Sequence, residues 1–138
     1  LTSERDDAVA RARLTELIGK IPGVDPGTLD AKLSQLLTPW FRNFAAYDPR
    51  PALSKLDVPL LALNGELDVQ VDAEQNATAI AAALRKGKNR RAEVRRMPGL
   101  NHLFQRAQTG AVAEYATIEQ TIAPEVLETL TTWISAQR

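Results

Sequence analysis

The clearest chemical signal in this sequence is an aspartate and a histidine that end two similar segments. Residues 64–68 (NGELD) and 98–102 (PGLNH) each have glycine in second position and finish with Asp68 or His102, the only histidine of the chain. A histidine can take a proton from a nucleophile and return it to a leaving group, while a carboxylate fixes its tautomer and stabilises its charged form. The two segments therefore predict a catalytic pair, with His102 as general acid/base and Asp68 as its orienting acid.

Other interpretations of these residues remain open at this stage. Glu66 lies in the same turn and is the alternative acid, whereas Asp72 is placed to cap the next helix. A lone loop histidine is commonly satisfied by ordinary hydrogen bonds, and aspartate is common in turns for conformational reasons. The match between the two segments favours catalysis. Asn101, next to His102, is expected to hold the loop or to touch substrate.

The nucleophile that such a pair would serve is not evident. The sequence contains no cysteine, so a thiolate is excluded. None of its serines stands between the glycines of a G-x-S-x-G turn; these serines are Ser3, Ser34, Ser54 and Ser135. We therefore expect the nucleophile to lie outside these 138 residues.

Composition narrows the classes of partner and cofactor. Hydrophobic residues make up 44% and charged residues 25%, as in ordinary globular proteins, and 17 basic side chains balance 17 acidic ones. This balance gives no support to a nucleic-acid partner, and the basic run over residues 85–96 is interpreted as a solvated helix end. No phosphate-binding glycine motif is present, and one histidine without cysteine argues against a metal site. No cofactor is predicted.

Localisation is not determined by the sequence. The longest apolar run, residues 58–63, is far shorter than the roughly 20 residues of a membrane span, so no membrane partner is expected. The chain begins with Leu1 and shows no signal-peptide pattern, which leaves a cytoplasmic and a periplasmic location equally open.

Residues 1–47 are predicted to be helical. Ser3 and Asp6 resemble a capping box that opens a first helix ending at Gly19, and Pro39 closes a second. Both are predicted to be amphipathic, with apolar faces formed by Val9, Leu14, Leu17 and Ile18 and by Leu29, Leu33, Leu36 and Leu37.

Aromatic residues gather at the end of this helical part. Trp40, Phe41 and Phe44 precede a proline-rich boundary near residue 48. Together with Phe104 they are candidates for an apolar acyl pocket, although aromatics at a helix junction more commonly form core.

Residues 48–138 alternate strands and helices. Two parallel strands are predicted at residues 58–63 and 92–97, with helices after Asp72, around 112–118 and from Pro124. The last helix is expected to bury Val126, Leu127, Leu130, Trp133 and Ile134. Because stable sheets usually need roughly three or more strands, the apolar edge of 58–63 should be covered by missing N-terminal strands of the same protein or by a second copy.

Several segments together resemble the C-terminal part of bacterial α/β-hydrolases. The closest likeness is to esterases and peptidases of the dienelactone-hydrolase and serine-aminopeptidase type, which carry a helical cap before their last strands. The segments that carry the resemblance are residues 47–49, 58–68, 98–104 and 114–125.

The resemblance implies an α/β fold in which residues 1–47 are a cap remnant and residues 48–138 contain the last two parallel strands with their helices. Asp68 matches the triad acid and His102 the triad base of a serine hydrolase that cleaves a small ester or a peptide. The nucleophile and the oxyanion hole are not matched, so the chain alone is expected to be inactive. The alternative is an inactive hydrolase fragment that dimerises through its exposed strand edge.

Overall fold

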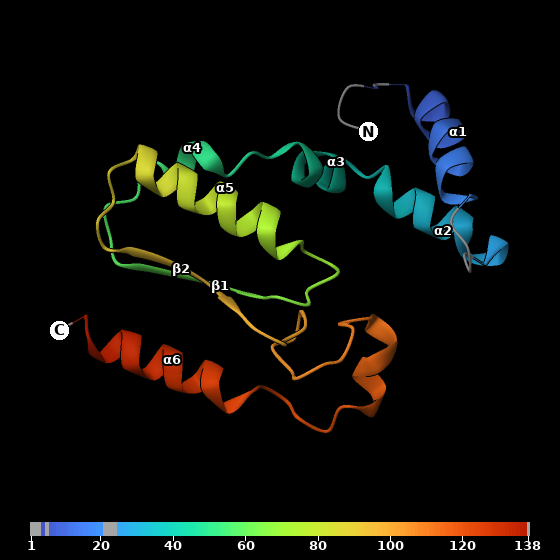
Figure 1. Cartoon of the computed structure of the whole chain (residues 1–138). Helices are drawn as coiled ribbons and strands as arrows, with labels where there is room; N and C mark the ends of the chain where they lie inside the picture. The colour runs from blue at the N-terminus through green and yellow to red at the C-terminus, as the bar shows by residue number, and fades with distance from the viewer. Residues whose placement is uncertain (1–3, 5, 21–24, 138) are drawn as a thin grey trace. The chain divides into compact units, whose positions relative to one another are not determined.

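The computed structural model describes residues 4, 6–20 and 25–137, and the chain divides into two compact units, Leu1–Asp48 and Pro49–Arg138. Figure 1 shows the order of the elements along the chain. The first unit contains α1 (Asp7–Ile18), α2 (Pro26–Leu36) and α3 (Pro39–Ala46). The second contains α4 (Arg50–Leu53), β1 (Leu60–Gly65), α5 (Ala73–Lys86), β2 (Ala92–Met97), the 3-10 helix η1 (Val112–Thr117) and α6 (Pro124–Ser135).

Helix α1 begins differently from the predicted capping box. The Asp6 carboxylate accepts hydrogen bonds from the backbone N–H groups of Ala8 and Val9, at 2.8 and 3.2 Å, so Asp6 is itself the N-cap. Ser3 lies outside the described residues. The helix ends at Gly19, as predicted. Its predicted apolar face is wrong in part, because Val9 and Leu17 are exposed and the buried residue is Ala10.

Helix α2 buries the face that its leucine spacing predicts, with Leu33 and Leu37 in the interior of the first unit. Pro39 does more than end this helix. Thr38 Oγ1 accepts a hydrogen bond from Phe41 N–H at 3.2 Å and caps α3, whose first residue is Pro39. A proline is well suited to that position because its missing N–H would have no helical partner there.

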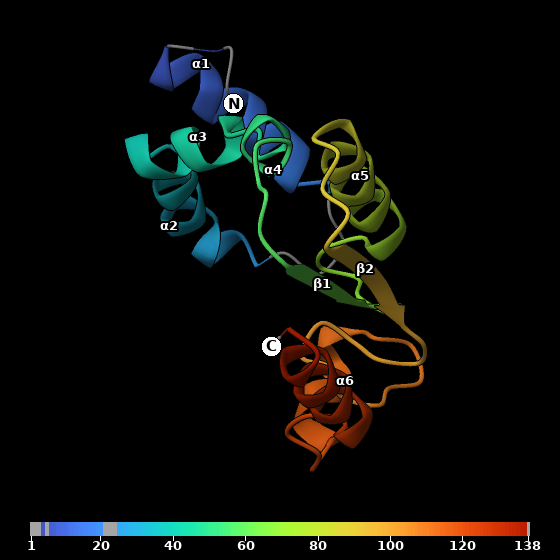
Figure 2. The same ribbon diagram turned by 90° about the vertical axis from the view of Figure 1, so that its left-hand side faces the viewer.

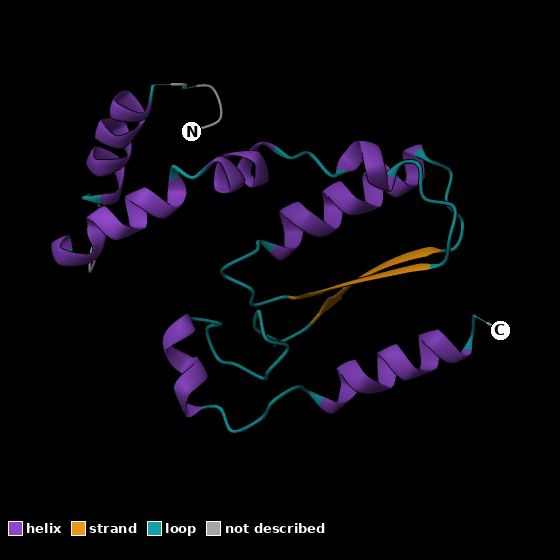
Figure 3. Ribbon diagram, turned by 180° about the vertical axis from the view of Figure 1, so that it is seen from behind, coloured by secondary structure: helices purple, strands orange, loops and turns teal. Residues whose placement is uncertain are grey.

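The two strands of the second unit form a parallel pair, as predicted (Figure 3). Strand β2 has the predicted bounds, but β1 starts and ends two residues later than residues 58–63. Pro59 has no N–H to donate and stays outside, while the pairing continues until Gly65 lies opposite Met97. The Glu66 N–H then donates to the Met97 carbonyl at 2.9 Å and ends the ladder.

Helices lie on both sides of this strand pair, α5 on one and α6 on the other (Figures 1 and 2). Helix α5 starts where Asp72 Oδ1 accepts the Gln75 N–H at 2.7 Å and ends at Gly87, as predicted. Its small side chains allow close packing on the sheet, and Ala77 and Leu84 are buried.

A compact apolar cluster lies where β2 leads into the histidine segment. It combines Met97, Leu100, Ala123 and Val126, with Leu130 packed against it. The predicted buried stripe of α6 is therefore only partly correct. Leu127 and Ile134 are 49% and 61% exposed, since two strands offer too little sheet to cover them.

The ends of the two strands approach so closely that Gly65 has no room for a side chain. A Cβ at this position would lie 2.3 Å from the Asn101 carbonyl oxygen and 2.4 Å from that of Leu100. Both obstacles are backbone atoms, so rotation of a side chain cannot relieve them. Gly65 thus sets the distance between the aspartate and histidine segments.

Replacing Gly65 with alanine should separate these segments and destabilise the second unit by about 1–3 kcal/mol, as overpacking typically does. Denaturant unfolding of the purified chain measures the change. Gly99→Asn is the matched control, because Gly99 has φ +69° but open space around its Cα, and asparagine tolerates left-handed backbone. Equal losses for the two variants would contradict this account.

Candidate active site

Asp68 and His102 meet beyond the carboxyl ends of the two strands. Asp68 lies in the turn after β1 and His102 in the turn after β2, and His102 Nδ1 is 2.9 Å from Asp68 Oδ2. The Asp68 side chain is only 4% exposed, whereas that of His102 is 38% exposed. The acid is therefore enclosed while part of the imidazole ring stays open to solvent.

Backbone N–H groups hold the Asp68 carboxylate in place. Its Oδ1 accepts hydrogen bonds from Gln70 N–H at 2.9 Å and Val71 N–H at 2.8 Å, which leaves Oδ2 for the histidine. Burial by itself would raise the pKa of Asp68, but the hydrogen bonds from Val71, His102 and Gln70 outweigh burial and lower the pKa below its ordinary value. Asp68 is thus ionised at neutral pH.

An ionised carboxylate only accepts hydrogen bonds, so the proton between Asp68 and His102 belongs to Nδ1 of the ring. In neutral histidine the other ring nitrogen, Nε2, is then the basic atom. The arrangement can accept a proton at Nε2 and stabilise the resulting positive charge through the buried carboxylate.

The other carboxylates near this turn lie elsewhere. Glu66 is exposed, and in the described part of the chain His102 bonds to Asp68 and not to Glu66. Asp72 caps α5, as its position before that helix predicts. Of the acids that the sequence left open, the fold brings Asp68 to the histidine.

Asn101 shapes the loop that carries His102. It is fully buried, and its Oδ1 accepts the backbone N–H groups of Leu103 at 3.0 Å and Gln105 at 2.9 Å. Its Nδ2 donates to Gln105 Oε1 at 3.0 Å. One amide side chain therefore binds polar groups of the two residues Leu103 and Gln105 that follow His102, and so fixes the turn that carries the histidine. Of the two roles expected for Asn101, the geometry corresponds to holding the loop.

Two glutamines that no sequence pattern predicted, Gln105 and Gln70, also support the pair. Gln105 is buried and donates from Nε2 to the Gln120 carbonyl at 2.8 Å, which ties the histidine loop to the chain before α6. Gln70 donates from Nε2 to the Tyr115 hydroxyl at 2.8 Å and ties the aspartate turn to η1. Isolated glutamines in loops follow no spacing pattern that would predict their contacts. The one signal in the sequence was the presence of two amide side chains, Asn101 and Gln105, four residues apart in the same loop.

The predicted aromatic pocket is not assembled within either unit. Trp40 is 70% exposed on α3 and stacks on Phe44, with ring centroids 5.5 Å apart. Phe41 lies beside them on the same helix, tilted against both rings. Phe104 belongs to the second unit and packs against the Met97 cluster. The pocket stays a prediction.

Residues 4, 6–20 and 25–137 contain no group of three or more histidine and carboxylate side chains that would hold a metal ion. Over the same residues, each helix is too short or too polar to cross a bilayer.

Comparison with protein families gave a match to the prolyl oligopeptidase family over residues 28–122, more than half of the chain. The chain belongs to the prolyl oligopeptidase family. This is an α/β-hydrolase-type family, so the resemblance seen in the sequence is confirmed at that level. The match spans both strands together with Asp68 and His102. Curated proteins and solved structures yielded no match.

In this member of the prolyl oligopeptidase family, Asn101→Ala should remove the acceptor of two N–H groups, of which that of Gln105 is buried and that of Leu103 partly buried. Leaving them unpaired costs about 2–4 kcal/mol of unfolding free energy and loosens the His102 ring. Denaturant unfolding and the NMR signal of the His102 Nδ1 proton check this. Asn76→Ala, which removes an exposed hydrogen bond on α5, is the control and should stay within about 0.5 kcal/mol. A sharp Nδ1 signal in Asn101→Ala would contradict the positioning role.

The lowered pKa of Asp68 predicts a specific dependence of stability on pH. Its folded pKa lies below the unfolded value of about 3.9, so ionised Asp68 stabilises the fold above that pH. This contribution is lost as pH falls through the folded pKa. Between about pH 7 and pH 2 the native chain should therefore lose more stability than Asp68→Asn. Parallel unfolding curves against pH for the two proteins would exclude this linkage.

Proposed function

We propose that this chain supplies the acid and the base of a serine hydrolase, Asp68 and His102, which act on a serine outside these 138 residues. The supporting observation is the 2.9 Å contact between a buried carboxylate and a half-open imidazole, in a chain of the prolyl oligopeptidase family. The reaction is hydrolysis of a carboxylic ester or a peptide bond. The family description favours the peptide bond.

The proposed steps follow from the proton positions. His102 Nε2 takes the proton of the serine hydroxyl as its oxygen attacks the carbonyl carbon, and the resulting imidazolium is stabilised by Asp68. His102 then gives that proton to the departing amine or alcohol, which leaves an acyl-enzyme. Water attacks the ester in the same way, with His102 again as base, and the serine regains its proton. Asp68 stays ionised throughout.

The serines of this chain support a nucleophile elsewhere. Ser54 Oγ donates to the Pro51 carbonyl at 2.9 Å, and Ser34 Oγ accepts from Arg11 at 3.1 Å. Ser135 is the last residue of α6, and Ser3 lies outside the described residues. None of the described serines is hydrogen-bonded to His102. As part of the same proposal, the helices of residues 1–47 are the remnant of a helical cap.

Activity of the complete gene product tests these roles. His102→Ala should abolish most turnover of peptide p-nitroanilides and p-nitrophenyl esters, and Asp68→Asn should lower kcat by about 10⁴, because it favours the wrong histidine tautomer. Glu66→Gln is the matched comparison and should keep turnover close to that of the native protein. Full turnover in His102→Ala would refute the proposal. If turnover fell in Glu66→Gln but not in Asp68→Asn, the acid would be Glu66 and not Asp68.

The 138-residue chain alone provides a second readout. A fluorophosphonate probe, which labels activated serines, should leave it unmodified. Covalent labelling of any of its own serines would show that the nucleophile lies within the chain.

A further inference from the structure

Strand β2 has a free edge in the described part of the chain. The sheet contains β1 and β2, so β2 is paired on one side. Hydrogen bonds at the two ends of the ladder use the carbonyls of Arg91 and Met97. Since the direction of backbone hydrogen bonding alternates along a parallel strand, the odd-numbered residues of β2 direct their N–H and C=O groups towards β1. Ala92, Val94 and Arg96 therefore direct their N–H and C=O groups away from the sheet.

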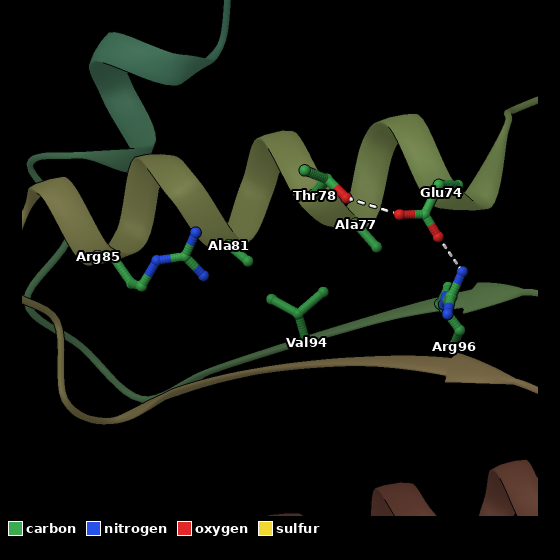
Figure 4. Close-up of a pocket in the computed structure, with 7 residues that line it drawn as sticks. All are labelled: Glu74, Ala77, Thr78, Ala81, Arg85, Val94 and Arg96. Atoms are coloured by element: carbon green, nitrogen blue, oxygen red, sulfur yellow. Dashed lines mark hydrogen bonds and ion pairs between the residues drawn. The ribbon is translucent and has the colours of Figure 1, made fainter.

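A groove of about 410 Å³ lies between α5 and β2, lined on the strand side by Val94 and Arg96 (Figure 4). Its middle is apolar, with Ala81 of α5 above Val94. At one end Arg96 pairs with Glu74. At the other end lies Arg85, which forms no ion pair with a carboxylate in the described ranges. The free edge thus has an apolar centre and charged ends.

We propose that two copies of this chain associate by pairing their β2 edges antiparallel, around a two-fold axis at Val94. In such a dimer, Val94 of each copy exchanges both backbone hydrogen bonds with the other, and Ala92 pairs with Arg96 of the second copy. All three outward-facing residues then have partners. This surface is independent of the roles of Asp68 and His102, and it is the edge opposite to the one of β1.

Charge selects this register over its neighbours. An axis one residue earlier would place Glu93 opposite Glu93 of the second copy, and an axis one residue later would place Arg95 opposite Arg95. Like charges directly opposite destabilise antiparallel pairs. With the axis at Val94, Glu93 of each copy lies opposite Arg95 of the other copy, which gives two pairs of opposite charge.

The same residues are already arranged for this contact. Glu93 and Arg95 form an ion pair on one face of β2, Nε to Oε1 2.5 Å, and their side chains are 41% and 44% exposed. In the symmetric dimer, Glu93 and Arg95 of both copies would therefore form a group of four charges that alternate in sign. The two-fold axis also exchanges the ends of the groove, which directs Arg85 towards Glu74 of the second copy.

A charge swap tests the dimer. Sedimentation velocity over a range of protein concentrations should give dimers for the native chain. Glu93→Arg and Arg95→Glu should each weaken association about tenfold or more, because every substitution acts twice across the axis. The double variant E93R/R95E restores the four alternating charges and should dimerise again. Arg90→Glu, with the same charge change as Arg95→Glu outside the paired residues, is the control and should stay dimeric.

Hydrogen exchange identifies the edge. The Val94 amide should become protected as concentration rises, whereas those of Leu61 and Leu63, which face away from β2, should not. Circular dichroism of each variant shows whether it remains folded. A native chain that is monomeric throughout, protection confined to Leu61 and Leu63, or a double variant that folds but does not dimerise would each overturn the proposal.

Discussion

The structure depends on the close approach of two backbone segments at Gly65. The Asn101 and Leu100 carbonyl oxygens occupy the space that a side chain at Gly65 would need. Next to this contact, Leu67 N–H donates to the Leu100 carbonyl at 2.9 Å and joins the two turns directly. Parallel strands alone would bring the turns to the same edge of the sheet. It is the missing side chain that lets Asp68 come within hydrogen-bond distance of His102.

Burial and hydrogen bonding then divide the roles within this pair. The carboxylate of Asp68 is enclosed and receives two backbone N–H groups, so its negative charge is compensated inside the protein. The His102 side chain is 38% exposed, and the Asn101 amide holds the loop that carries it. Proton transfer to and from an outside group needs both conditions. Asp68 orients Nδ1 of the His102 ring, and Nε2 is the nitrogen left to exchange a proton with that group.

The two strands differ in the edges that they leave open. Strand β1 is apolar, and Leu127 and Ile134 of α6 are exposed within the same unit, which fits a surface that further strands would cover. Strand β2 carries Glu93 and Arg95 beside Val94, so its edge discriminates between registers by charge. Self-recognition through β2 would leave the β1 edge available to the rest of a larger sheet. The two surfaces need not compete.

Local patterns in the sequence determined the β2 bounds, the Asp72 cap of α5 and its end at Gly87, because these depend on residues a few positions apart. The parallel pairing and the family type also followed from the sequence. Burial was predicted less well, as the exposed Leu17 and Leu127 show, because an apolar stripe is buried only if a partner surface exists. Tertiary structure alone decided the 2.9 Å contact that joins Asp68 to His102 and the close approach of Gly65 to the Asn101 carbonyl. They depend on the distance between backbone segments more than thirty residues apart, which no local pattern encodes.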